Sequence, residues 1–99
     1  MIAVSVLIRT IGRQPALKDA LDSLLVQSLK DFEVVVVEDG PATLVEFLKA
    51  YDNLAVRYEA LGLRKGRSTA GNRAMELAQG QYCLFLDEDD LLYPAHLKR

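Results

Sequence analysis

The stretch Phe32-Glu33-Val34-Val35-Val36-Val37-Glu38-Asp39-Gly40 decides the fold class of this 99-residue chain. Its run of valines favours a β-strand, and a strand that is apolar on both sides is expected where helices cover both faces of a parallel sheet. The strand should end near residue 38, because Asp39-Gly40-Pro41 is a strong turn signal. This stretch therefore predicts an inner strand of a layered α/β protein.

Strands and helices alternate on both sides of this stretch. Before it, residues 3–8 predict a strand, and the leucines and alanines that follow Pro15 at helical spacing predict a helix. After it we expect a helix over residues 44–51, a strand over 54–58, a basic loop over 61–67, a helix from about 68 to before Gly80, and a strand over 82–86. The short connections favour right-handed crossovers. We therefore expect a three-layer α/β/α fold with a mostly parallel sheet of about four strands.

The composition is that of one ordinary globular domain spanning residues 1–99, with 51% hydrophobic and 26% charged residues. The formal charge of -2 argues against nucleic-acid binding, which depends on a basic surface. Cys83 is the one cysteine, so neither an internal disulfide nor a thiolate zinc cluster is expected, and its apolar strand predicts a core position. The sequence shows neither a signal peptide nor a transmembrane segment, which makes the cytoplasm the expected location.

Polar residues follow three of the predicted strands. In parallel sheets of this kind the carboxyl ends of the strands lie along one edge, where ligands bind. The exits Arg9-Thr10, Glu38-Asp39 and Asp87-Glu88-Asp89-Asp90 should therefore meet at that edge. Sequence positions far apart would then form one site.

Each of these polar groups has a functional and a structural interpretation. Asp87 and Asp89 offer hard oxygen ligands suited to Mg²⁺ or Mn²⁺, but a solvated acidic turn is an equally good interpretation of the acid run. Asp39 could accept hydrogen bonds from a base or a ribose, whereas an Asp-Gly turn needs no ligand. The basic loop that includes Arg67 could hold a phosphate or could simply be solvated.

The order of these segments resembles family 2 glycosyltransferases, which have the glycosyltransferase A type of fold. The resemblance covers nearly the whole chain. It is carried by residues 4–8, 20–28 and 31–40, and by Ala70-Gly71-Asn72, residues 78–82 and Phe85-Leu86-Asp87-Glu88-Asp89-Asp90, with Pro94 and Leu97 beyond. The last of these segments is similar to the family's metal-binding DXD motif.

The resemblance implies the N-terminal, Rossmann-like half of a domain that binds a nucleotide-diphospho-sugar, most simply of the uridine type. It implies that Asp39 contacts the base and that Thr10 lines the floor beneath the nucleotide. Asp87 and Glu88 would lie near the ribose and diphosphate, and Asp89, with Asp87, would hold Mn²⁺ or Mg²⁺. The ion would stabilise negative charge on the departing diphosphate.

Departures from the family pattern limit these expectations. The family commonly shows Pro-Thr-Tyr-Asn after the first strand, whereas this chain has Arg9-Thr10-Ile11-Gly12, so an aromatic contact to the base should be missing. Gly71 stands where relatives often carry an arginine, which makes Arg67 the candidate substitute. We expect the domain to be truncated at its C-terminal end, and the sequence identifies neither a catalytic residue nor the acceptor.

The sequence is therefore compatible with two functions. The first is a hexosyltransferase-like enzyme, or its donor-binding half, that transfers a sugar from the nucleotide to an acceptor. The alternative is a non-catalytic nucleotide-binding or interaction module. An exposed edge of the fourth strand would also allow pairing with a second copy of the chain.

Overall fold

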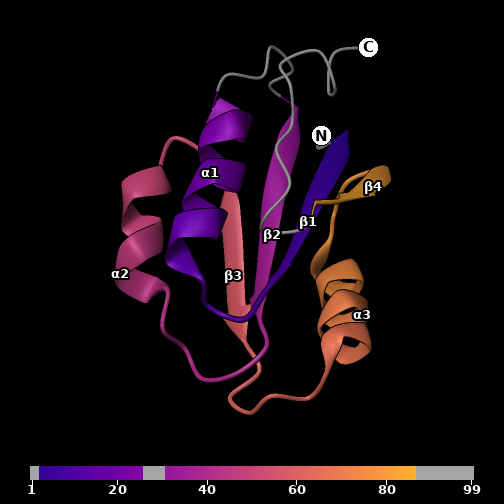
Figure 1. Cartoon of the computed structure of the whole chain (residues 1–99). Helices are drawn as coiled ribbons and strands as arrows, with labels where there is room; N and C mark the ends of the chain where they lie inside the picture. The colour runs from indigo at the N-terminus through magenta and orange to yellow at the C-terminus, as the bar shows by residue number, and fades with distance from the viewer. Residues whose placement is uncertain (1–2, 26–30, 87–99) are drawn as a thin grey trace.

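The computed structural model describes residues 3–25 and 31–86, and the account below concerns these residues. Its centre is a sheet with the strand order β3-β2-β1-β4, and every neighbouring pair is parallel. The strands are β1 (Val4–Thr10), β2 (Phe32–Glu38), β3 (Val56–Ala60) and β4 (Tyr82–Phe85). The predicted α/β class and the parallel four-stranded sheet are confirmed (Figure 1).

Helices cover the two faces of the sheet. Figure 1 shows α1 (Gln14–Leu25) and α2 (Val45–Leu48) on one side and α3 (Arg67–Leu77) on the other. A 3-10 turn, η1 (Lys49–Tyr51), extends α2, so the second predicted helix is shorter and tighter than its sequence pattern indicates. The predicted three-layer arrangement is confirmed.

The larger core lies beneath α1. Even-numbered residues of β1 and β2 face this layer because side chains alternate along a strand. They pack with the apolar stripe of α1 and with residues from the α2 region, in a buried cluster that includes Val6, Ile8, Leu17, Ala20, Leu21, Leu24, Val34, Val36, Leu44 and Tyr51. The predicted helical stripe after Pro15 is therefore the face that anchors α1.

The opposite core is smaller. Leu7, Val35 and Val37 face α3, which meets them with Ala70 and Ala74. Because alanine side chains are short, the backbone of α3 can lie close to the sheet. This close approach determines what can fit beside Gly71, which is buried on the same helix.

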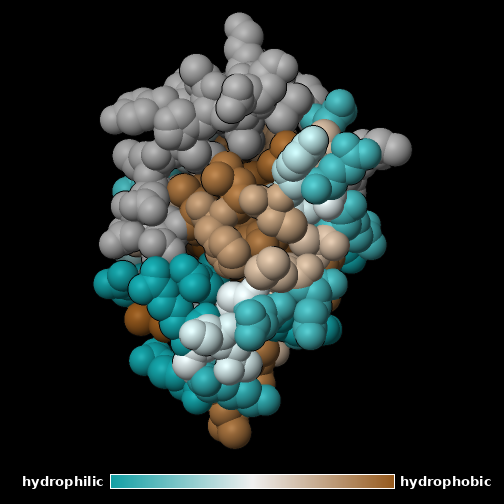
Figure 2. Space-filling view, turned by 90° about the vertical axis from the view of Figure 1, so that its right-hand side faces the viewer, coloured by the Kyte–Doolittle hydropathy of each residue, from teal (hydrophilic) through white to brown (hydrophobic). Residues whose placement is uncertain are grey.

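β4 lies at an edge of the sheet, and its residues are more exposed than the apolar sequence predicts. Cys83 is exposed, so the predicted core position is wrong. Tyr82 and Phe85 are also exposed, as is Met75 of α3. Figure 2 shows apolar surface gathered at the middle of this side of the molecule. The core position predicted from the apolar sequence fails because β4 has a neighbour only on its β1 side among the described residues.

In the described part of the chain, the helices are too short or too polar to cross a membrane.

Candidate functional site

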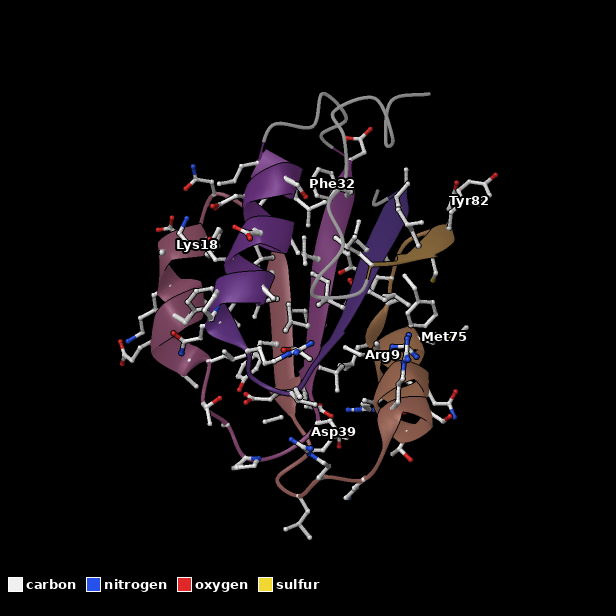
Figure 3. The ribbon with its side chains drawn as sticks, viewed as in Figure 1. Arg9, Lys18, Phe32, Asp39, Met75 and Tyr82 are labelled. Carbon is white, nitrogen blue, oxygen red and sulfur yellow. The ribbon has the colours of Figure 1, made fainter. Side chains whose placement is uncertain are left out.

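Thr10 and Asp39 meet where the two central strands end. The backbone N–H of Asp39 donates to the carbonyl of Thr10 at 2.8 Å, and the Thr10 hydroxyl accepts from the N–H of Gly12 at 3.0 Å. Both side chains are buried, at 3% and 6% exposure. Figure 3 shows Asp39 at the same end of the sheet as Arg9, opposite Phe32 and Tyr82. The expectation that the first two polar strand exits share one edge is confirmed.

The Asp39 carboxylate holds the loop that precedes α3. Its Oδ1 accepts from the N–H of Lys65 at 2.6 Å, and its Oδ2 accepts from the N–H of Gly66 at 3.1 Å. Gly66 has a φ of 104°, a conformation that side-chain-bearing residues rarely adopt. The glycine therefore allows the chain to turn both N–H groups toward one carboxylate. Each carboxylate oxygen retains a lone pair with which it could accept from a ligand.

Glu38 connects the loops on the other face of the sheet. It is buried, and its Oε1 accepts from the N–H of Thr43 at 2.9 Å and from the hydroxyl of Tyr58 at 2.6 Å. Its Oε2 accepts from the Thr43 hydroxyl. Burial, and then the bond to Glu38, raise the pKa of Tyr58 to about 12. Both carboxylate oxygens of Glu38 thus bind protein groups.

Gly12 lets the first loop pass close to this network. It has a φ of 92°, and a Cβ placed on it would lie 2.8 Å from Oε2 of Glu38 and 3.0 Å from the Thr43 hydroxyl oxygen. A larger residue would have to displace the Glu38 carboxylate. Ile11, which precedes this glycine, is exposed.

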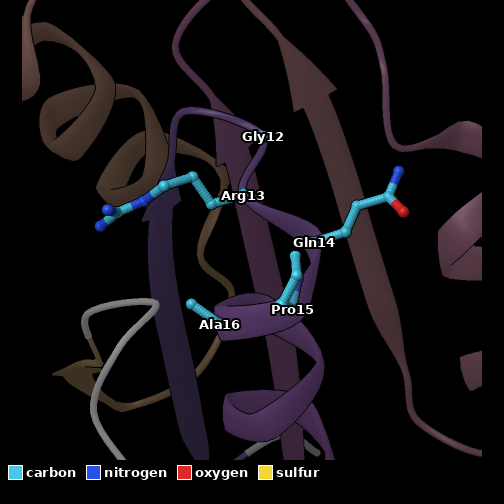
Figure 4. Close-up of a pocket in the computed structure, with 5 residues that line it drawn as sticks. All are labelled: Gly12, Arg13, Gln14, Pro15 and Ala16. Atoms are coloured by element: carbon cyan, nitrogen blue, oxygen red, sulfur yellow. The ribbon is translucent and has the colours of Figure 1, made fainter.

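A pocket of about 550 Å³ lies at the turn between β1 and α1. Its lining is one continuous segment, Gly12, Arg13, Gln14, Pro15 and Ala16. Figure 4 shows the side chains of Arg13 and Gln14 extending from this turn in opposite directions. The volume is within the range of small-ligand sites, and the pocket adjoins the polar strand ends described above.

Arg9 lies on the α3 side of the same edge. Its guanidinium carbon is 4.9 Å from the centre of the Phe85 ring, a cation–π distance. A Cβ placed on Gly71 would lie 3.2 Å from the Cδ and 3.3 Å from the Nη1 of Arg9. The arginine therefore lies along the α3 backbone at the one position where that helix face carries no side chain.

The remaining predicted residues are only partly placed. Arg67 is the exposed first residue of α3 and follows directly on the Gly66 turn. Asp87, Glu88 and Asp89 lie outside the described residues, so their predicted positions at this edge stay predictions. Within residues 3–25 and 31–86, no three His, Cys, Asp or Glu side chains gather as a metal site requires.

The sequence places Arg9 at this edge but gives it no role, and it does not predict the partners of Asp39. The backbone donors of Lys65 and Gly66 leave no mark in the sequence except the glycine that permits the turn. For Arg9 a signal existed, because a charged residue two positions after Leu7 must lie on the same face of the strand as that core residue.

The open parallel sheet, with buried polar side chains at the carboxyl ends of its central strands, defines an α/β protein of the kind that binds ligands at this edge. The sequence model of the family described as "Glycosyl transferase family 2" matches residues 5–99. The chain therefore belongs to glycosyl transferase family 2, and the resemblance noted from the sequence is confirmed.

Relatives and solved structures agree with this assignment. The chain is 29% identical over 96 residues to the uncharacterized glycosyltransferase YwdF of Bacillus subtilis, covering 97% of this chain and 36% of that protein. It is 32% identical over 98 residues to the uncharacterized glycosyltransferase EpsJ of the same organism, covering 97% of this chain and 28% of EpsJ.

The fold matches that of S. aureus TarS residues 1–349 in complex with UDP-GlcNAc, with a TM-score of 0.90, 29% identity, and coverage of 98% of this chain and 29% of that 1–349 chain. It also matches the mannosyltransferase PcManGT from Pyrobaculum calidifontis in complex with GDP-Man and Mn²⁺, with a TM-score of 0.78, 26% identity, and coverage of 89% and 28%. The chain thus spans about a third of the length of these relatives.

Proposed function

We propose that this chain binds the nucleotide-diphosphate part of a sugar donor and forms the donor-binding part of a glycosyltransferase. The observation that carries the proposal is the joining of the buried Thr10 and Asp39 at the carboxyl edge of the central strands. The likeness to TarS bound to UDP-GlcNAc supports this ligand class.

The proposed roles follow from what each group can donate or accept. Asp39 would accept a hydrogen bond from the base while its other lone pairs hold the loop at Lys65 and Gly66. Thr10 would form the floor beneath the nucleotide, next to the pocket at the β1–α1 turn. Arg67, exposed at the start of α3, would face the negatively charged part of the donor.

Asp87 and Asp89 would hold a divalent cation, with Glu88 near the ribose and diphosphate. The donor set fits Mn²⁺ or Mg²⁺, because these ions take carboxylate oxygens and complete their coordination with phosphate and water. When bound, the ion would supply Lewis-acid stabilisation of the departing diphosphate. The likeness to PcManGT, which was solved in complex with GDP-Man and Mn²⁺, supports this choice of ion.

Titration calorimetry with UDP and Mn²⁺ tests the proposal directly. We expect saturable binding of UDP, which Asp89→Ala weakens at least about tenfold. We also expect GDP to bind with lower affinity than UDP. Asp52→Ala is the matched control, because Asp52 is an exposed carboxylate that precedes β3 and so lies toward the opposite end of the sheet. Absence of UDP and GDP binding, or binding that Asp89→Ala leaves unchanged, would contradict the site assignment.

Transfer of the sugar is a separate proposal. A general base must lie within hydrogen-bond reach of the acceptor hydroxyl, and none of the described residues has been assigned that task. A transfer assay with UDP-GlcNAc distinguishes an enzyme from the alternative binding module: release of UDP that depends on an acceptor favours the enzyme, and binding without release favours the module.

A further inference from the structure

Arg9 is a cation fixed at the carboxyl edge of the sheet. It follows Leu7 by two residues on β1 and so lies on the face that α3 covers. Phe85 pairs with Leu7 in the parallel register, which puts its ring on this face too. The guanidinium is 4.9 Å from the ring centre, and the side chain is half-buried. A guanidinium held by an aromatic ring loses little further freedom when it binds an anion.

Gly71 makes the position of Arg9 possible. A helix interior normally disfavours glycine relative to alanine. Here a Cβ on Gly71 would come within 3.2 Å of the Arg9 Cδ, closer than ordinary van der Waals contact. Any side chain at position 71 would therefore push the arginine away from the α3 backbone.

Arg9 also lies between Asp39 and the end of β4. Asp39 follows Val37 by two residues and thus lies on the same face of the sheet as Arg9, whose register partner is Val37. On its other side, β4 ends beside β1: Leu86 donates its N–H to the carbonyl of Leu7 at 2.9 Å. A ligand that reaches from Asp39 toward the end of β4 must pass Arg9.

We propose that Arg9 binds the diphosphate of the donor nucleotide and that Gly71 sets the position from which it does so. The inference rests on the proposed function. A nucleoside diphosphate with one divalent ion still carries negative charge, and the planar guanidinium matches two phosphate oxygens at once. Lysine, a point charge that cannot form this fork, would be a poorer substitute.

Amide chemical-shift titrations with UDP and with uridine, both in the presence of Mg²⁺, test the role of Arg9. Arg9→Gln should weaken UDP binding at least about tenfold and uridine binding less than about twofold, because only UDP carries the phosphates. Arg9→Lys should lie between Arg9→Gln and the unaltered protein. Arg57→Gln is the matched control, since Arg57 contacts Glu33 near the opposite end of the sheet.

Gly71→Ala provides a second variant with opposite effects on stability and binding. Alanine favours the helix, so the melting temperature should stay the same or rise, while UDP affinity should fall severalfold because Arg9 is displaced. If Arg9 had only a structural role, Gly71→Ala would not lower the UDP affinity while leaving the melting temperature unchanged or higher.

The outcomes distinguish this inference from the proposed function. If the unaltered protein binds neither UDP nor uridine, both are wrong. If UDP binding is intact in Arg9→Gln, or if UDP and uridine weaken equally, Arg9 does not bind the phosphates and only this inference is overturned.

Discussion

The two ends of β2 use buried carboxylates in different ways. At the amino end, Glu33 accepts from the Ser5 hydroxyl at 2.6 Å and from the N–H of Gln79 at 2.6 Å, and the Ser5 hydroxyl accepts from the N–H of Gly80 at 2.8 Å. At the carboxyl end, Asp39 accepts from the N–H groups of Lys65 and Gly66 in a glycine-containing loop. Both carboxylates hold a loop against the sheet by accepting hydrogen bonds from its backbone N–H groups.

Space distinguishes the two ends. A Cβ on Gly80 would lie 2.7 Å from the backbone nitrogen of Ser5, so the chain at the amino end is packed against backbone. A Cβ on Gly66 or Gly40 would meet nothing within 4 Å. A buried carboxylate thus indicates a binding site only where the loops that it holds leave room for a ligand.

The largest expected effect is that of Gly80→Ala. The added methyl group collides with the backbone of Val4 and Ser5, which cannot rotate away, so we expect a loss of about 3 kcal/mol of unfolding free energy. Urea denaturation measures it. The same loss should occur in a Ser5→Ala background, because the backbone atoms remain; a fall in melting temperature of less than about 2 °C would contradict close packing here.

Glu33→Ala should come next. It leaves the Ser5 hydroxyl and the N–H of Gln79 without their acceptor, and unsatisfied buried donors make the expected loss about 2 kcal/mol. Affinity for UDP in the folded fraction should not change. A selective loss of UDP binding with unaltered stability would reverse the roles assigned to the two ends.

Asp39→Ala should destabilise the fold less than Glu33→Ala does, and it should weaken UDP binding more. The N–H groups of Lys65 and Gly66 can turn to water, so we expect about 1 kcal/mol of destabilisation, while UDP affinity falls at least about tenfold. Denaturation and calorimetry on the same variant separate the two. Asp39→Asn keeps one acceptor oxygen. Its unfolding free energy should therefore stay closer to that of the unaltered protein than its UDP affinity does.

Tyr58→Phe gives the smallest effect, and it depends on pH. Tyr58 keeps its proton in the folded protein up to a pKa of about 12, above the usual tyrosine pKa of 10.0. The stability that this shift provides is fully present below pH 10 and is lost as pH rises toward 12. Between these values the unaltered protein should therefore lose more stability than Tyr58→Phe. Parallel curves for the two proteins would contradict the raised pKa, and with it the burial and hydrogen bonding of the Tyr58 hydroxyl.

The valine run and the apolar stripe after Pro15 were sufficient to predict the sheet and its layers, because parallel sheets impose these patterns on their strands and helices. The exposure of Cys83 was not predictable in the same way. An apolar strand has similar composition whether it lies inside a sheet or at its edge, and only the strand order, with β4 outermost among the described strands, distinguishes the two.

The strand-end residues of the candidate site could be predicted from the sequence, but the contacts that these residues make could not. Thr10 and Asp39 follow from the topology, but Asp39 binds backbone N–H groups, which every residue except proline possesses. The contact of Arg9 with Gly71 joins two segments far apart in the chain, and neither residue predicts the other alone.

The central claim is that a nucleoside diphosphate binds the carboxyl end of the sheet and not the amino end. Backbone amide shifts on addition of UDP with Mg²⁺ test it most directly. The account predicts that the largest changes occur at Thr10, Gly12, Asp39, Lys65 and Gly66, with little change at Ser5, Glu33 and Gly80. Changes concentrated around Ser5 and Gly80, or no changes at saturating UDP, would contradict it.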